Sequence, residues 1–133
     1  MSVLLDTHVW VWWLTADPRL RAAERAALDA SAEKSELYLS AISLWEAQML
    51  HSKKRLDLPV AFAEWLELAA DPSMLKVVPL DVGVVLALDA LPSSFHGDPA
   101  DRVIVATARA HALALATRDA AIRRARVTRL WRP

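Results

Sequence analysis

The chain has 133 residues, of which 55% are hydrophobic, and these values exclude a disordered chain and allow one domain with a real core. Its 16 Lys and Arg balance its 16 Asp and Glu, so net charge gives no overall attraction to nucleic acid, and a polyanionic partner needs a local basic surface. The absence of cysteine excludes disulfides, thiolate metal sites and a cysteine nucleophile, and is compatible with a reducing cytoplasm.

The apolar N-terminus resembles a targeting signal only superficially. Residues 1–13 lack a basic leading region and carry Asp6 inside the apolar run, which argues against a signal peptide. No apolar run approaches the roughly 20 residues that span a bilayer. We therefore expect a soluble, cytoplasmic protein with no membrane partner.

Asp6 follows the first predicted strand. Residues 2–5 form a short apolar run whose length and Val and Leu content suit a buried strand. Ligands bind at the carboxyl ends of strands in parallel α/β sheets, so Asp6 stands where a site is expected. An equally good interpretation is that Asp6 caps the helix starting near His8. In that helix Trp10 and Trp13 are one turn apart and are expected in the core or at a dimer interface.

A second helix is predicted over residues 19–31, after a break at Asp17 and Pro18. Its apolar positions recur at helical spacing. Its charged residues are expected to form a solvated face. These are Arg21, Glu24, Arg25 and Asp29.

Glu46 belongs to a long helix that follows a predicted strand at 37–39 and runs to about His51. If Ser43 caps this helix, Ser43 and Glu46 form a capping box and the carboxylate is engaged by the backbone. If Ser40 is the cap, Glu46 lies nearly two turns into the helix and is free to point at a site. A charge among its apolar neighbours would then need a partner.

The middle of the chain contains further predicted elements. In order, they are a basic run at 51–55, a helix over 58–70, a strand over 76–80, a helix over 81–88 and a turn-rich loop over 92–97.

Two carboxylates then stand at the start of a largely apolar helix. Asp98 is predicted as the N-cap and Pro99 as the first helical residue, where a missing N–H costs nothing. Asp101 falls one turn in. Taken alone, both acids only complement the positive end of the helix dipole. A site requires that other carboxylates converge on them.

A fourth acid ends the next predicted strand, at 114–116. Asp119 follows that strand closely, and helix capping is again the competing interpretation. A last short strand is predicted over 127–130. The same C-terminal segment carries a local basic surface that the zero net charge conceals. Its arginines are Arg118, Arg123, Arg124, Arg126, Arg129 and Arg132.

Strands that alternate with helices predict a three-layer α/β domain with a central, mainly parallel sheet flanked by helices. In such a sheet Asp6 and Asp119 end strands on one edge, and Glu46 and Asp101 lie near helix starts that open onto it. Converging carboxylates repel one another unless some are protonated or a cation intervenes, and hard oxygen ligands select Mg²⁺ or Mn²⁺. A phosphodiester is the natural substrate for such a site.

The order of four motifs resembles the PIN-domain ribonucleases of the VapC toxin type. The motifs are Leu5-Asp6-Thr7-His8, Ser43-Leu44-Trp45-Glu46, Asp98-Pro99-Ala100-Asp101-Arg102 and Leu115-Ala116-Thr117-Arg118-Asp119. The resemblance covers essentially the whole chain. It implies a single PIN domain over residues 1–133, RNA cleavage that depends on Mg²⁺ or Mn²⁺, a homodimer, and inhibition by a cognate antitoxin.

The resemblance also implies roles for particular residues. The catalytic and metal-binding acids are Asp6, Glu46, Asp101 and Asp119. Asp101 is preferred over Asp98 because the family's third acid directly precedes the apolar segment 104–107, which leaves Asp98 as a cap or an outer-shell partner. Thr7 and Thr117 match supporting hydroxyl positions. Two other functions stay open: a non-catalytic PIN-like module that binds RNA or antitoxin, and a metal-dependent hydrolase of small phosphate esters. The intact acidic set favours the nuclease.

Overall fold

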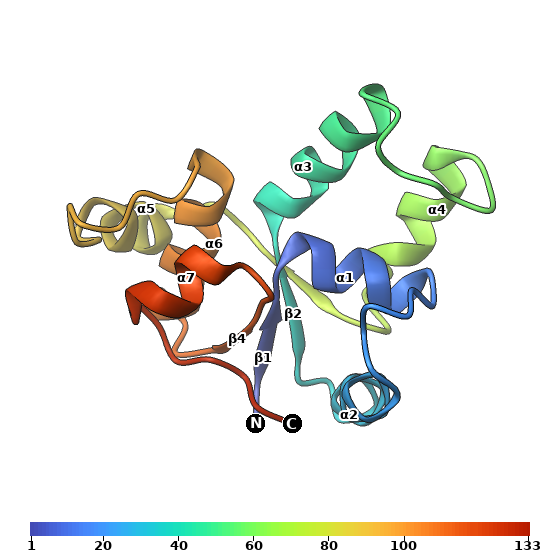
Figure 1. Ribbon diagram of the computed structural model, residues 1–133, viewed down its shortest axis with the longest axis horizontal. Coiled ribbons are helices and arrows are strands. Elements are labelled where there is room, and N and C mark those ends of the chain that lie inside the picture. The colour runs from blue at the N-terminus through green and yellow to red at the C-terminus, as the bar shows by residue number, and fades with distance from the viewer.

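Four parallel strands form the centre of the computed structural model, which describes residues 1–133 (Figure 1). The strands are β1 (Val3–Leu5), β2 (Leu37–Ser40), β3 (Lys76–Val78) and β4 (Ala114–Ala116). Their order in the sheet is β3-β2-β1-β4, and every neighbouring pair is parallel. The predicted α/β class with a parallel sheet is confirmed.

Seven helices cover the two faces of this sheet (Figure 1). They are α1 (Thr7–Leu14), α2 (Ala22–Glu33), α3 (Ala41–Ser52), α4 (Phe62–Ala69), α5 (Val82–Asp89), α6 (Pro99–Ala110) and α7 (Ala120–Ala125). None of them has the length and apolar composition that a bilayer crossing requires.

The core consists of two apolar layers on either side of β1. Val3 and Leu5 pack with α1, α2 and α4 on one face, and Leu4 packs with α5, α6 and α7 on the other. This alternation follows from the two-residue period of a strand, and it explains why an uninterrupted apolar run marks a strand that is buried on both faces. On the first face Trp10 is fully buried and its indole N–H donates to the Ala69 carbonyl at 3.0 Å.

Polar caps start the helices that lead away from the sheet. The Ser40 hydroxyl caps α3 by accepting a hydrogen bond from the Ile42 N–H, at 3.2 Å. Ser40 and not Ser43 is therefore the cap, so Glu46 is not part of a capping box. Asp98 caps α6, and Pro99 is the first residue of that helix, as predicted.

Several predicted boundaries are corrected. The second helix spans residues 22–33, and the helix expected over 58–70 begins only at Phe62. The strand expected over 76–80 ends at Val78, directly before Pro79, which has no N–H for the ladder. The strand expected over 127–130 is wrong, because only Leu130 pairs with the sheet, through one bridge to Leu115. At the start of this segment the Val127 carbonyl accepts a hydrogen bond from the Arg109 guanidinium at 2.9 Å, and not from a strand.

Candidate functional site

The acids of the predicted site come from four elements that open onto one edge of the sheet. In the register of the sheet, Leu5 at the end of β1 is level with Leu39 and Ala116. Parallel strands bring their carboxyl ends to the same edge, so the residues that follow β1, β2 and β4 meet there. The sequence places Asp6, the start of α3 and the Thr117–Asp119 segment at this edge.

Asp6 is both a helix cap and a member of the acidic cluster. Its Oδ1 accepts a hydrogen bond from the Thr7 N–H at 2.8 Å, and its Oδ2 accepts one from the Thr117 hydroxyl at 2.6 Å. The side chain is almost completely buried. Burial raises the pKa of Asp6, the two hydrogen bonds oppose that rise, and the charge of Asp119 adds to it. The capping and site interpretations of Asp6 are therefore compatible.

Glu46 lies on α3 with nine-tenths of its surface buried. The Thr7 hydroxyl donates a hydrogen bond to its Oε1, and the same hydroxyl lies 2.8 Å from the Ser43 Oγ. Burial raises the pKa of Glu46, and the charge of Asp6 raises it further, whereas the Thr7 hydrogen bond lowers it. Thr7 thus supplies the partner that a buried acid needs in this apolar helix.

Asp101 lies in the first turn of α6, near the other acids of the cluster. Its backbone N–H donates to Asp98 Oδ1 at 2.8 Å, and its own carboxylate caps nothing. Burial raises the pKa of Asp101 to about 7, and four nearby charges add to the rise. In decreasing order of effect, these belong to Asp98, Asp6, Asp119 and Glu46. The structure therefore places the other four acids close enough to Asp101 to raise the pKa of its carboxyl group.

Thr117 connects two of the acids. Its hydroxyl donates to Asp6 and accepts from the Asp119 N–H at 3.0 Å. Asp119 in turn caps α7, because its Oδ1 accepts from the Ile122 N–H at 2.9 Å. The two predicted supporting hydroxyls, those of Thr7 and Thr117, thus donate to two carboxylates of the cluster, those of Glu46 and Asp6.

The donor set of the cluster suits a hard divalent cation. Carboxylate oxygens are the ligands that Mg²⁺ and Mn²⁺ prefer, and mutual repulsion among the acids is the condition that a cation relieves. No three of the Asp, Glu and His side chains are arranged so that they could hold a metal ion together. Mg²⁺ usually keeps several waters and binds directly through one or two carboxylates, so the other acids of the cluster would reach the ion through bound water.

Two contributors to the site were missed from the sequence. Ser43 is fully buried against Thr7, and its position one turn before Glu46 on the same helix was the available signal. Gly97 lies against Asp101: a Cβ at Gly97 would stand 3.1 Å from the Asp101 Cβ and 2.7 Å from the Phe95 Cζ. Only glycine fits there without displacing a neighbour.

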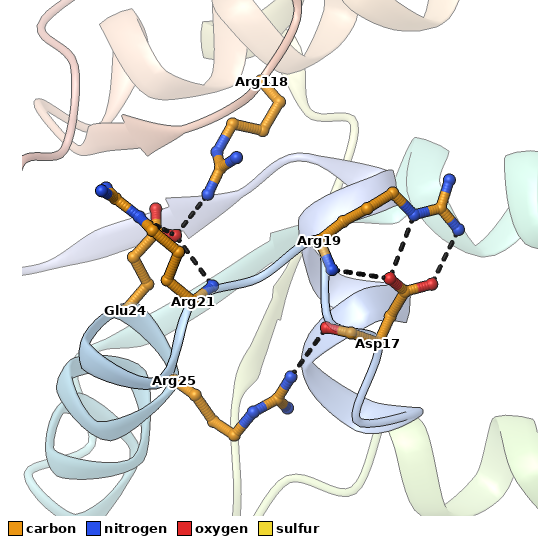
Figure 2. Close-up of polar contacts among 6 residues, drawn as sticks. All are labelled: Asp17, Arg19, Arg21, Glu24, Arg25 and Arg118. Carbon is orange, nitrogen blue, oxygen red and sulfur yellow. Dashed lines mark hydrogen bonds and ion pairs between the residues drawn. The ribbon is translucent and has the colours of Figure 1, made fainter.

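The expected solvated face of α2 is wrong for Glu24. This residue is only 6% exposed, and its carboxylate pairs with Arg21 at 3.1 Å and with Arg118 (Figure 2). Arg25 is also engaged, because its guanidinium donates to the carbonyls of Trp13 and Asp17. Glu24 is covered because Arg118, from the β4–α7 segment, reaches it, whereas Arg21 and Asp29 are exposed as expected.

Known proteins share both the sequence pattern and the architecture of this chain. A family model described as PIN domain matches residues 3–127. The chain is 38% identical over 122 residues to Ribonuclease VapC22 of Mycobacterium tuberculosis (strain ATCC 25618 / H37Rv), covering 92% of this chain and 90% of that protein.

Two solved structures have a similar fold. The crystal structure of VapBC2 from Rickettsia felis, bound to a DNA fragment from their promoter, gives a TM-score of 0.73 at 20% identity and covers 98% of both chains. The structure of FitAB bound to an IR36 DNA fragment gives a TM-score of 0.68 at 25% identity, with 97% of this chain and 93% of that chain covered.

Proposed function

The chain belongs to the PIN-domain family, and we propose that it is a metal-dependent endoribonuclease and the toxin of a toxin–antitoxin pair. The observation that carries this proposal is that Asp6, Glu46, Asp98, Asp101 and Asp119 lie together at one edge of the parallel sheet, where the charges of the other four acids raise the pKa of Asp101. The ribonuclease named among its relatives supports RNA as the substrate. We further propose that residues 1–133 form one domain that acts in the cytoplasm.

In this proposal the cation is Mg²⁺ or Mn²⁺, and its ligands are Asp6, Glu46, Asp101 and Asp119. When bound, such an ion activates water for attack and offsets negative charge in the transition state. The chain contributes the positions of the ligands. Thr117 fixes the carboxylate of Asp6, and Thr7 fixes that of Glu46. Asp98 caps α6, and its carboxylate accepts a hydrogen bond from the backbone N–H of Asp101, which sets the position of Asp101.

Cleavage of single-stranded RNA by the purified protein tests the function. We expect cleavage with Mg²⁺ or Mn²⁺, none with EDTA, and none by Asp101→Asn under any condition. Asp89→Asn, which removes one exposed carboxylate at the far end of α5, is the matched control and should cut like the wild type. Cleavage that resists EDTA, or an active Asp101→Asn, would refute the proposal. Turnover of a chromogenic phosphate ester without RNA cleavage would assign the site to small esters.

We propose that the protein forms a homodimer through an apolar surface on and beside α5. Four large apolar residues are exposed there, with exposed fractions between 47% and 75%. They are Leu80, Val82, Val85 and Leu86. Isolated exposed apolar residues are ordinary, but a group on one short helix marks an interaction surface. Sedimentation should give a dimer for the wild type and a monomer for Val82→Asp/Leu86→Asp.

We also propose a small antitoxin as the second partner, encoded by an adjacent reading frame. The acidic cluster would pair well with an arginine side chain of that partner, which would compete with the cation. Co-purification should show a complex with weaker RNA cleavage than the free protein. Expression of the chain alone should arrest growth, and unaffected growth with soluble, active protein would contradict the toxin assignment.

A further inference from the structure

A pocket of about 330 Å³ lies beside the acidic cluster, between α2, the segment after β4 and the last residues of the chain. Its polar lining is mostly arginine. The four arginines are Arg21, Arg118, Arg123 and Arg132. The apolar part of its lining includes Val9, Leu20, Leu130 and Trp131.

Glu24 is the single acidic side chain in this lining. Burial alone would raise the pKa of Glu24, but hydrogen bonds from the Arg21 backbone and from the Arg118 and Arg21 side chains together lower it. Glu24 is therefore a fixed anion that holds two of the guanidinium groups at the pocket (Figure 2). Arg123 and Arg132 form no ion pair of their own. Glu24 and the terminal carboxylate of Pro133 cannot neutralise four arginines, so the pocket carries net positive charge.

Thr117 belongs to both the pocket and the acidic cluster. Thr117 lines the pocket, and its hydroxyl donates to Asp6 at 2.6 Å. Three consecutive residues thus serve two neighbouring regions. Thr117 contacts the acidic cluster, Asp119 belongs to it, and Arg118 between them reaches Glu24 in the pocket. A ligand that spans both regions would place an anionic group on the arginines and another group at the acids.

We propose that the arginine pocket binds a phosphate of the RNA strand adjacent to the phosphodiester that is cut, an inference that rests on the proposed ribonuclease function. Guanidinium groups bind phosphate through charge-assisted, often bidentate hydrogen bonds. The apolar wall with Trp131 suits the attached sugar or base. An antitoxin fits this pocket less well, because the basic side chain that it would use at the acids is repelled by the arginines. The pocket volume is also near the lower limit of ligand sites and does not admit a helix.

The pocket is tested by the affinity for a fluorescein-labelled, single-stranded RNA of twelve nucleotides and mixed sequence. All proteins carry Asp101→Asn, so that Mg²⁺ can be present without cleavage. The pocket variant is Arg123→Gln/Arg132→Gln, whose residues are exposed and whose side chains make no hydrogen bond within the protein. The matched control is Arg55→Gln/Arg124→Gln, which removes two exposed arginines outside the pocket.

The pocket variant should bind the RNA about tenfold or more weakly, because each lost contact is a hydrogen bond to a charged group. The slope of log K against log salt should fall by about 0.7 for one lost phosphate contact. The control should bind within about twofold of the parent. Equal weakening in both variants would show a general charge effect and overturn the proposal.

The remaining outcomes separate this inference from the ribonuclease function. If the unmutated chain cuts RNA and the pocket variant keeps full affinity, the pocket proposal fails and the ribonuclease function stands. If the unmutated chain neither binds nor cuts RNA, both fail. Unchanged RNA affinity with lost binding of the co-purified antitoxin would assign the pocket to the protein partner and overturn the RNA proposal.

Discussion

The hydroxyl of Thr7 donates a hydrogen bond to the carboxylate of Glu46, which lies on a different helix and is nine-tenths buried. Replacing Thr7 with Val keeps the shape and removes the hydroxyl, so the carboxylate and Ser43 both lose a partner. The free energy of unfolding should fall by about 1–3 kcal/mol, the usual cost of an unsatisfied buried group. Urea unfolding measures this loss.

The same substitution should also change the pH dependence of cleavage. The Thr7 hydrogen bond lowers the pKa of Glu46, so its loss raises that pKa further, and the acid limb of the rate profile should move to higher pH. Thr7→Ser retains the hydroxyl and should restore both stability and profile. A Thr7→Val protein with the stability and profile of the wild type would show that this contact is unimportant.

The stability of the metal-free protein should fall as pH rises between about 4 and about 7. Asp101 has a pKa of about 7 in the folded chain against a usual value of 3.8, so across this range the folded state holds a proton that the unfolded chain has released. Unfolding then releases that proton and becomes easier as pH rises, until the effect levels off above the folded pKa. Melting curves from pH 4 to 8 measure it. Mg²⁺ should flatten the decline, because a cation stabilises the ionised acids.

Asp101→Asn should melt at a higher temperature than the wild type at pH 8 without metal, because it removes one charge from a repelling cluster. It should also gain less from Mg²⁺. The alternative is that Asp101 only complements the helix dipole. In that case the free energy of unfolding of Asp101→Asn should be lower than that of the wild type by about 0.3–1 kcal/mol, with or without metal. A less stable Asp101→Asn with an unchanged Mg²⁺ shift would support that alternative.

The substitution Asp98→Asn separates two effects of this residue, its capping of α6 and the effect of its charge on Asp101. Asn is as good an N-cap as Asp, so its side-chain oxygen should keep the bond to the Asp101 N–H and stability should change little. Of the nearby charges that raise the pKa of Asp101, the charge of Asp98 has the largest effect, so its loss should lower that pKa. NMR titration of the Asp101 carboxyl measures the shift. Loss of cleavage in Asp98→Asn would make Asp98 a ligand and not an outer-shell partner.

Gly97→Ala should destabilise the protein by about 1–3 kcal/mol, a typical cost of overpacking, and reduce cleavage. Its Cβ would stand 2.7 Å from the ring of Phe95, which is almost fully buried, and 3.1 Å from the Cβ of Asp101. The matched control is Gly83→Ala in α5, where the nearest atom is the Asp81 Oδ1 at 3.5 Å. That change should be neutral or stabilising by up to about 1 kcal/mol. Equal melting temperatures for the two variants would contradict the close contact at Gly97.

The positions of the acids could be predicted because they depend on local signals. An apolar run followed by Asp6 indicates a strand end, and parallel pairing brings such ends to one edge. The cap of α3 was ambiguous, because Ser40 and Ser43 are both good caps. The strand that ends at Ser40 decides between them, because it makes Ser40 the cap. Glu46 is then not part of a capping box and can belong to the acidic cluster.

Other features depend on contacts between distant segments. Glu24 lies on a helix whose pattern indicates a solvated face, and it is buried because Arg118 reaches it from beyond β4. The residues around Val127 have strand-forming composition, but the Val127 carbonyl is bound by Arg109 from α6 and only Leu130 pairs with β4. Local composition carries no information on which partner is available, so neither feature was visible in the sequence.

The central claim is that Asp6, Glu46, Asp101 and Asp119 hold one divalent cation together. Calorimetric titration of Mn²⁺ into the wild type and into Asp6→Asn, Glu46→Gln, Asp101→Asn and Asp119→Asn tests it most directly. We expect binding to the wild type, binding at least about tenfold weaker in each variant, and wild-type affinity in Glu67→Gln, which removes an exposed acid on α4. Mn²⁺ affinity that none of the four substitutions changes would contradict the claim.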